Sequence, residues 1–207
     1  VYGNEHKTPS EIFALRDHGS KKDSPGWKVR VVANKYNALE IEKNPVRDFD
    51  GIFESMDGCG AHEIIIDTPK FPSKFEDLSA EEVANILFTA KERVNDLQRD
   101  FRIRYISIFK NQGALAGASI SHPHTQIIAL PMIPKNILTE IESCRAHYKK
   151  TSRSLICDLA ISEIRAKSRI VEDDDNFVSF CPYASFWPFE VNICPKKTVK
   201  DFARSEE

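Results

Sequence analysis

Two histidines and a glutamine alternate along one short segment of the chain, His122-Pro-His124-Thr-Gln126. On a strand, side chains at alternate positions face the same way, so we expect these three to share one face. A neutral imidazole is a good nucleophile toward phosphorus, and an amide is a hydrogen-bond donor for a phosphate oxygen. The pattern therefore favours a phosphate-handling site in which a histidine is the nucleophile.

The residues on either side of the first histidine suit the same ligand. The backbone from Gly117 to Ser121 can turn its N–H groups toward phosphate oxygens, and the Ser119 hydroxyl adds another donor. Pro123 lacks the N–H that a central strand position needs. The histidine segment is therefore predicted to lie at a strand start or at a sheet edge.

The hydrophobic pattern predicts the elements that would position this segment. Apolar residues at helical spacing, after a capping box of Ser79 and Glu82, predict a helix from Ala80 to about Asp100. A second helical stretch, interrupted near 150–154, is predicted at 136–168. Residues 1–27 and 44–60 are predicted to be extended or loop segments. Strands are predicted at 29–33, 62–67, 103–109, 126–130, 177–181 and 189–194.

Two blocks of the sequence resemble each other. In each, a strand (62–66 or 189–193) is followed by a proline and a lysine, and then by a segment that ends in two glutamates. Strand, proline turn and helix start therefore recur. We expect an α+β fold, an antiparallel sheet with helices against it. It would hold one full repeat in residues 1–170 and the beginning of a second in 171–207, with the remainder absent.

Composition argues against several classes of protein. The 207 residues fit one or two domains, and 29 basic against 31 acidic residues argue against a protein built around nucleic acid. No apolar run approaches the ~20 residues of a membrane helix, and the polar N-terminal segment is unlike a signal peptide. Five cysteines, with no CxxC pair, predict reduced thiols and a cytoplasmic protein.

Together these residues resemble the galactose-1-phosphate uridylyltransferase family of the histidine-triad superfamily, which includes ADP-glucose phosphorylase-like nucleotidyltransferases. The resemblance implies a histidine-triad-like nucleotidyltransferase unit in residues 1–170 and the beginning of a second such unit in 171–207. Five blocks carry it in order: Gly3-Asn-Glu with Thr8-Pro-Ser-Glu11, Arg30-Val-Val-Ala-Asn34-Lys-Tyr-Asn-Ala-Leu39, His62-Glu-Ile-Ile-Ile-Asp-Thr-Pro69, Asn111-Gln-Gly-Ala with Gly117, Ser119 and His122-Pro-His124-Thr-Gln126, and Phe186-Trp-Pro-Phe-Glu190.

The resemblance also implies roles for single residues. His124 would attack the α-phosphorus of a nucleotide sugar, forming a nucleotidyl-histidine, and Gln126 would hold a phosphate oxygen. Related hydrolases place a third histidine at the Gln126 position, and an amide cannot shuttle a proton. Asn34 would bind the base and ribose. The phosphate would be bound by Asn111, Gly117 and Ser119.

The implied reaction moves UMP between hexose 1-phosphates, so the partners are a nucleotide sugar and a sugar 1-phosphate. A homodimer is carried over from the family, with no nucleic-acid or membrane partner. Two alternatives stay open. One is an adenylyltransferase that acts on ADP-glucose with inorganic phosphate as acceptor, and the other is a histidine-triad nucleotide-binding module without transferase activity.

The family also implies a structural zinc ion. Many members bind it through a CxxC pair and two histidines that match His62 and His122. This chain shows no CxxC, and two histidines alone do not close a four-ligand zinc site. Cys59, three residues before His62, is either a recruited ligand or, as we expect, a buried thiol.

Overall fold

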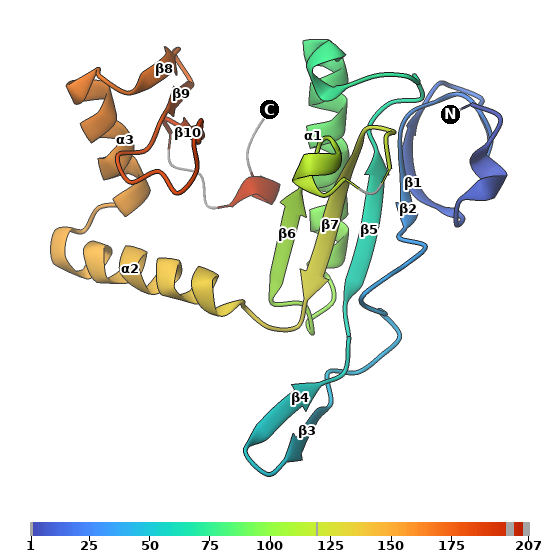
Figure 1. The fold of residues 1–207 in the computed structure, drawn as a ribbon, viewed down its shortest axis with the longest axis horizontal. Coiled ribbons are helices and arrows are strands. Elements are labelled where there is room, and N and C mark those ends of the chain that lie inside the picture. The colour runs from blue at the N-terminus through green and yellow to red at the C-terminus, as the bar shows by residue number, and fades with distance from the viewer. Residues whose placement is uncertain (1, 119, 198–200, 205–207) are drawn as a thin grey trace. The chain divides into compact units, whose positions relative to one another are not determined.

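The computed structural model describes residues 2–118, 120–197 and 201–204, and the chain divides into two compact units, Val1–Ile133 and Pro134–Glu207. The first unit is built on a five-stranded antiparallel sheet with strand order β1-β2-β5-β7-β6 (Figure 1). An α+β fold is therefore confirmed. The five strands are β1 (Glu11–Arg16), β2 (Trp27–Ala33), β5 (Ala61–Ile66), β6 (Tyr105–Phe109) and β7 (His124–Leu130).

Helix α1 (Ala80–Leu97) covers one face of this sheet. It begins where the capping box predicts, because the Ser79 hydroxyl accepts from the Glu82 N–H while the Glu82 carboxylate accepts from the Ser79 N–H. Its stripe packs on alternate residues of the strands, and the members that are buried are Ile86, Ala90, Val94 and Leu97. Leu87, an apolar residue at the same helical spacing, is instead 52% exposed.

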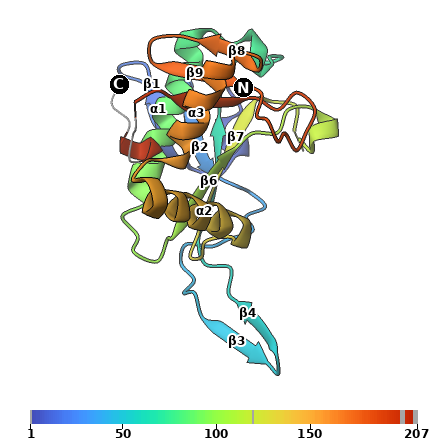
Figure 2. The same cartoon turned by 90° about the vertical axis from the view of Figure 1, so that its left-hand side faces the viewer.

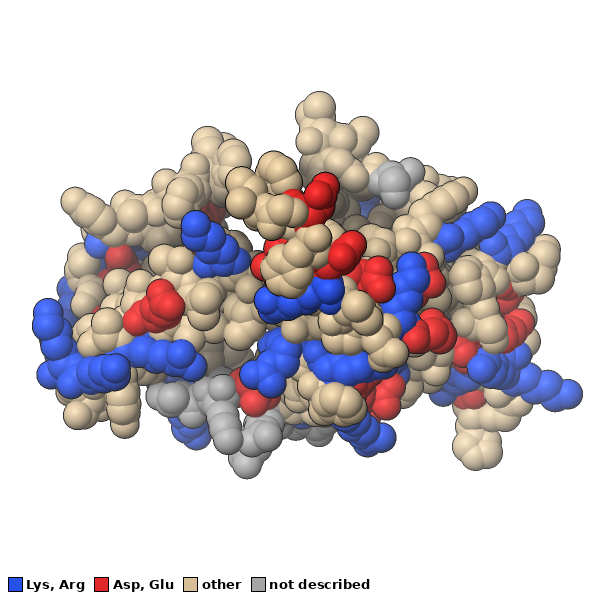
Figure 3. Space-filling view, turned by 90° about the horizontal axis from the view of Figure 1, so that it is seen from below, with Lys and Arg blue, Asp and Glu red and all other residues tan. Residues whose placement is uncertain are grey.

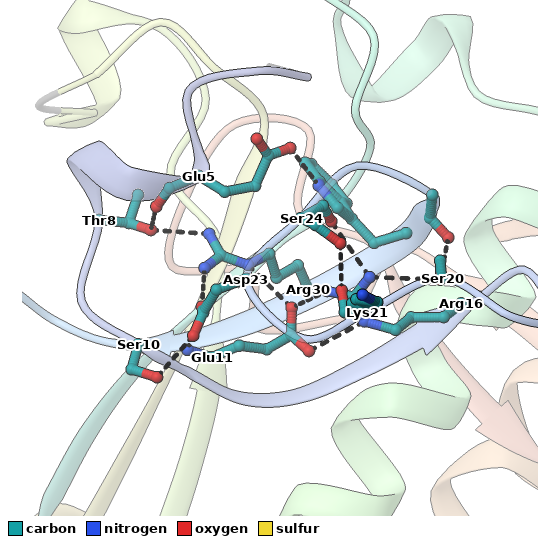
Figure 4. Close-up of polar contacts among 12 residues, drawn as sticks. Glu5, Thr8, Ser10, Glu11, Arg16, Ser20, Lys21, Asp23, Ser24 and Arg30 are labelled. Carbon is teal, nitrogen blue, oxygen red and sulfur yellow. Dashed lines mark hydrogen bonds and ion pairs between the residues drawn. The ribbon is translucent and has the colours of Figure 1, made fainter.

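Strand β1 lies in a region predicted to be an extended segment and a loop. Phe13 and Leu15 pack against the apolar core, but the strand begins at the buried charge of Glu11 and exposes the apolar Ile12, so its hydrophobic alternation is weak. The Arg30 guanidinium donates to the Glu11 carboxylate at 3.0 Å, to the Thr8 hydroxyl at 2.7 Å and to the Asp23 carboxylate at 2.6 Å (Figure 4). These bonds lower the pKa of Asp23 to about 2, chiefly through the Ser10 hydroxyl and against the effect of burial.

The prediction of a loop at 44–60 is wrong. This segment forms a hairpin of β3 (Arg47–Asp50) and β4 (Phe53–Met56), which reaches away from the five-stranded sheet (Figures 1 and 2). Neither strand has a buried face, and Phe49 and Phe53 are 65% and 71% exposed. Without a buried side the alternation that marks a strand is absent.

The second unit combines two helices with a three-stranded antiparallel sheet, in the order β10-β9-β8. The helices are separated where the sequence predicts an interruption, since Ser152 is left-handed (φ 57°) and Ser154 caps the next helix. Val178 and Phe180 form its core with Ala160. The elements are α2 (Lys135–Thr151), α3 (Leu155–Ala166), β8 (Ile170–Asp173), β9 (Phe177–Phe180) and β10 (Asn192–Pro195).

The compact units divide at 133/134, whereas the predicted sequence repeats divide at 170/171. The difference arises because α3 packs on β8 and β9 and therefore belongs with the second sheet. The repeat boundary describes sequence similarity and stays a prediction.

The surface carries both signs of charge. Figure 3 shows Lys and Arg side chains interspersed with Asp and Glu on one face. Within the described residues, no helix has the length and apolarity to cross a membrane. None of the five cysteines, all of which lie within the described residues, forms a disulfide, and Cys59 is completely buried.

Candidate active site

The pairing of β5 with β7 decides which face of the sheet each site residue occupies. His124 lies opposite Ile66, and Gln126 lies opposite Ile64. The alternate residues Ile65, Ile127 and Ala129 belong to the core beneath α1. Because residues directly opposite share a face, His124 and Gln126 lie together on the face turned away from α1. Pro123 precedes β7, so the proline falls at a strand start, as predicted.

The His124 ring is held in one orientation by its own backbone. Its Nδ1 lies 2.9 Å from the carbonyl oxygen of His122, and the side chain is almost completely buried. A carbonyl only accepts, so Nδ1 carries the hydrogen, and in the neutral ring Nε2 carries the lone pair. Within the described part of the chain, Nε2 has no hydrogen-bond partner. The atom available as a nucleophile is therefore Nε2.

The His122 ring is fixed differently. Its Nε2 donates to the carbonyl oxygen of Thr68 at 2.7 Å, and its ring stacks on Phe71 with centroids 5.5 Å apart and planes 16° from parallel. Burial lowers the pKa of His122 below the ordinary histidine value, although the hydrogen bond to Thr68 acts in the opposite direction. The Nε2 of His122 is thus occupied by a backbone carbonyl, unlike the Nε2 of His124, so His122 is not the expected nucleophile.

His62 connects two residues predicted to contact substrate. Its Nε2 lies 3.0 Å from the Oε1 of Gln126 and 2.9 Å from the amide nitrogen of Asn34, and its Nδ1 lies 3.3 Å from the same Asn34 nitrogen. If the ring donates from Nε2 to the Gln126 oxygen, the Asn34 amide donates to Nδ1, the longer of its two contacts with the ring. With its Oε1 occupied, Gln126 presents its NH₂ group as the free donor, the group a phosphate oxygen needs.

The structure does not bring His62 and His122 together as a metal pair. His62 lies opposite Ile128, six residues along from His122, which corresponds to about 20 Å at the usual strand rise. Zinc–nitrogen bonds are about 2.0–2.1 Å long, so one ion cannot bind both rings in this arrangement. Among the described residues, no group of three or more His, Cys, Asp or Glu side chains suits a metal. The side chains present do not fit the zinc site that the family resemblance implies.

The remaining predicted residues belong to the loop between β6 and β7. Asn111 lines a cavity of about 560 Å³ together with Lys74, Lys110, Gln112, His122 and Pro123. Gly117 ends a short 3-10 turn (Ala114–Ala116) in the left-handed region, at φ 81°, which disfavours any residue with a Cβ. Ser119 lies outside the described residues. The loop therefore places an amide and a glycine turn beside the histidine segment.

Two residues at this end of the sheet escaped the sequence analysis. The Lys110 ammonium lies 2.5 Å from the Oδ2 of Asp67 and donates to the carbonyl oxygen of His124 at 3.0 Å. The signal available for Asp67 is a carboxylate that ends an apolar strand, and the signal for Lys110 is its place directly before Asn111. Neither signal reveals the partner, because 43 positions separate the two residues.

Comparison with known proteins points to one family. Residues 16–134 match the family model for the galactose-1-phosphate uridyl transferase N-terminal domain. The chain is 33% identical over 202 residues to an ADP-glucose phosphorylase of Arabidopsis thaliana, which covers 97% of this chain and 55% of that protein. It is 29% identical over 178 residues to a galactose-1-phosphate uridylyltransferase of Thermotoga maritima, covering 84% of this chain and 55% of that protein.

Solved structures give the same result for the fold. A crystal structure of the A. thaliana ADP-glucose phosphorylase with bound ADP-glucose superposes with a TM-score of 0.83 at 31% identity, covering 100% of this chain and 61% of that chain. A uridylyltransferase structure follows with a TM-score of 0.82 at 26% identity, over 91% of this chain and 60% of that one. The chain spans about half the length of the curated relatives it matches. It belongs to the galactose-1-phosphate uridyl transferase family, whose N-terminal domain it contains.

Proposed function

We propose that this chain carries the nucleophile of a nucleotidyltransferase that moves UMP between hexose 1-phosphates. The observation that supports this most is the His124 ring, whose Nδ1 is occupied by the His122 carbonyl while Nε2 retains its lone pair. Gln126, on the same face, offers an NH₂ donor because His62 occupies its oxygen. Nucleophile and phosphate-oxygen donor are thus two positions apart on one strand.

The proposed reaction has two displacements at phosphorus. The Nε2 of His124 attacks the α-phosphorus of the nucleotide sugar, a P–N bond forms, and the P–O bond to the departing sugar 1-phosphate breaks. An oxygen of the incoming sugar 1-phosphate then attacks the same phosphorus and breaks the P–N bond. The Gln126 amide donates to a non-bridging oxygen during both steps, and the Asn111 amide and the Ser119 hydroxyl add donors from the loop. Gly117 contributes the left-handed turn of that loop, since its own N–H donates to the Ala114 carbonyl at 3.0 Å. Asn34, on the other side of His62, would bind the nucleoside.

A second donor, ADP-glucose, is favoured by one observation. The ADP-glucose phosphorylase relative matches more of this chain at higher identity than the uridylyltransferase relative does, 97% at 33% against 84% at 29%. In that case the incoming group is inorganic phosphate and the intermediate is adenylyl-histidine. The predicted homodimer and cytoplasmic location belong to the same proposal.

Mass spectrometry of the full-length protein tests the proposal. After brief exposure to UDP-glucose or to ADP-glucose, the protein gains the mass of UMP or AMP, and the gain identifies the donor. His124→Gly abolishes the adduct, while the control variant His6→Asn, at an exposed position, retains it. An adduct that persists in His124→Gly or maps to His122 contradicts the assignment. If neither donor gives an adduct, the alternative of a histidine-triad nucleotide-binding module without transferase activity is favoured.

The amide at position 126 gives a second test. An amide can donate to the intermediate but cannot take a proton from water, so the isolated adduct persists until sugar 1-phosphate or phosphate arrives. Gln126→His speeds loss of the adduct to water relative to loss to the acceptor, measured by single-turnover decay. If the wild-type adduct hydrolyses as fast as it transfers, the protein is a hydrolase.

A further inference from the structure

Three consecutive carbonyl oxygens around the nucleophile each accept a hydrogen bond. The His122 oxygen accepts from the His124 ring at 2.9 Å, and the Pro123 oxygen accepts from the Asp67 N–H at 3.2 Å. The His124 oxygen accepts from the Lys110 ammonium at 3.0 Å. Two of the three donors therefore come from residues whose side chains form one ion pair, Asp67 and Lys110. This pair joins the end of β5 and the end of β6 to the start of β7.

This ion pair is poorly suited to stabilise the fold. The Asp67 side chain is fully buried and the Lys110 side chain is 18% exposed, so both charges are largely removed from water. Buried pairs of this kind typically add little net stability, because desolvation offsets the attraction. In addition, the Oδ1 of Asp67 has no hydrogen-bond partner among the described residues, which carries a further penalty.

What the pair does is hold one ammonium group at a defined place. The Lys110 ammonium has three donors, of which one serves Asp67 and another serves the His124 carbonyl. The ammonium also lies 5.3 Å from the centre of the Phe75 ring, which closes a further side. Lys110 directly precedes Asn111, so the same residue connects the proposed phosphate loop to the nucleophile's backbone.

We propose that Lys110, held by Asp67, is a positioning residue for His124. It keeps the backbone of 122–124 in the conformation in which the His122 carbonyl receives the Nδ1 hydrogen, so that Nε2 keeps its lone pair and its direction. The inference rests on the proposed function, because it concerns how that nucleophile is aimed. Lys110 touches no reacting atom in this account.

The test compares a single and a double variant of the full-length protein. Lys110→Met removes the ammonium but leaves a buried carboxylate, and Lys110→Met with Asp67→Leu removes both charges and restores folding stability. We expect both to form the nucleotidyl adduct about 100-fold more slowly at saturating donor, since a displacement near 1 Å has about that effect. The donor concentration for half-maximal rate stays within about threefold, because ground-state binding is not altered. Lys70→Met, an exposed lysine on the β5–α1 connection, is the matched control.

The ¹⁵N NMR spectrum of the histidine rings supplies a readout that does not need turnover. In the wild-type protein His124 shows a protonated Nδ1 and an unprotonated Nε2, and both Lys110 variants show a mixture of tautomers. A double variant that regains both stability and wild-type adduct formation overturns the proposal, as does an unchanged tautomer in both variants. A wild-type protein that forms no adduct contradicts the proposed function instead, and the tautomer comparison still decides the role of Lys110.

Discussion

Two buried carboxylates, Glu63 in β5 and Asp67 directly after it, are neutralised in different ways. Glu63 receives a two-pronged fork from Arg93 of α1, with Nε and Nη2 each 2.8 Å from a different carboxylate oxygen. Asp67 receives one ammonium, from Lys110, and keeps one oxygen without a partner among the described residues. Both side chains are at most 6% exposed, so burial does not explain the difference.

The difference lies in what each cation has left to give. A guanidinium matches both oxygens of a carboxylate, so Nε and Nη2 of Arg93 hold α1 to the sheet, while its Nη1 donates to Asp96 of the same helix at 2.8 Å. An ammonium satisfies one oxygen and has donors left, and one of these reaches the His124 carbonyl. The complete pair lies beneath the helix, and the incomplete pair lies beside the proposed nucleophile. The further donor of Arg93 therefore stays within its own helix, whereas that of Lys110 reaches the backbone of the proposed nucleophile.

Removing the fork should have the largest effect on stability. Arg93→Met leaves Glu63 buried without a cation, and we expect the free energy of unfolding to fall by about 3–5 kcal/mol. Urea unfolding followed by circular dichroism measures the change. The double variant Glu63→Leu with Arg93→Met should recover most of the loss, and a double variant as unstable as the single one would contradict this account of the fork.

Asp67→Asn should destabilise less. The amide oxygen can still accept from Lys110, but an NH₂ group with two donors replaces an oxygen that has no partner among the described residues. The Lys110 ammonium also loses its counter-charge, although at 18% exposure it keeps contact with water, which Glu63 beneath α1 lacks. We expect a loss of about 1–3 kcal/mol, below that of Arg93→Met, in the same unfolding measurement. A loss equal to or greater than that of Arg93→Met would show that the two carboxylates are equivalent.

Lowering the pH should destabilise the fold through protonation of His122, which contacts the Thr68 carbonyl next to Asp67. Burial places the pKa of the folded His122 below the ordinary value of 6.5, so the unfolded chain takes up the proton first as the pH falls. The free energy of unfolding is therefore highest, as far as His122 is concerned, above pH 6.5, where the ring is neutral in both states. It decreases as the pH falls from 6.5 to the folded pKa, with a slope of at most about 1.4 kcal/mol per pH unit. His122→Gln should flatten this part of the stability profile. An unchanged profile would assign the acid sensitivity to other groups.

Lys110→Arg should have the smallest effect on stability. It distinguishes the contact of Lys110 with the Asp67 carboxylate from its contact with the His124 carbonyl. A guanidinium at this position can engage both oxygens of Asp67, as Arg93 does with Glu63, and the free energy of unfolding should stay within about 1 kcal/mol. The donor to the His124 carbonyl is then withdrawn, so ¹⁵N NMR should show loss of the single ring tautomer. Retention of that tautomer would indicate that either cation positions the ring.

The parts of the fold governed by local rules were predictable. The capping box predicts the first residue of α1, and Pro123 predicts the start of β7. Strand β1 escaped because its core-facing Phe13 and Leu15 are accompanied by a buried Glu11 and an exposed Ile12, and the β3–β4 hairpin escaped because it has no buried face. Periodicity reports the contrast between two faces, which is weak in β1 and missing from the hairpin.

The candidate site was predictable as a set of residues but not as a set of contacts. Resemblance assigns His62 and His122 to one zinc ion, whereas the strand register places His62 beside Gln126 and Asn34. Register depends on how distant segments pair, which no local pattern specifies. The Asp67–Lys110 pair escaped for the same reason, as each residue alone is an ordinary charged side chain.

Strand β7 is bordered by β5 on one side and β6 on the other, whereas β3 and β4 have only each other. Local unfolding therefore differs between the two regions. The β3–β4 hairpin can open by itself, whereas release of β7 requires loss of its hydrogen bonds to β5 and to β6 at the same time. Amide hydrogens of β7 should accordingly exchange with solvent at rates set by unfolding of the whole sheet. The proposed nucleophile therefore lies on one of the strands of the first unit that are expected to open most rarely. We expect any movement that accommodates the successive substrates to occur in the loops around it.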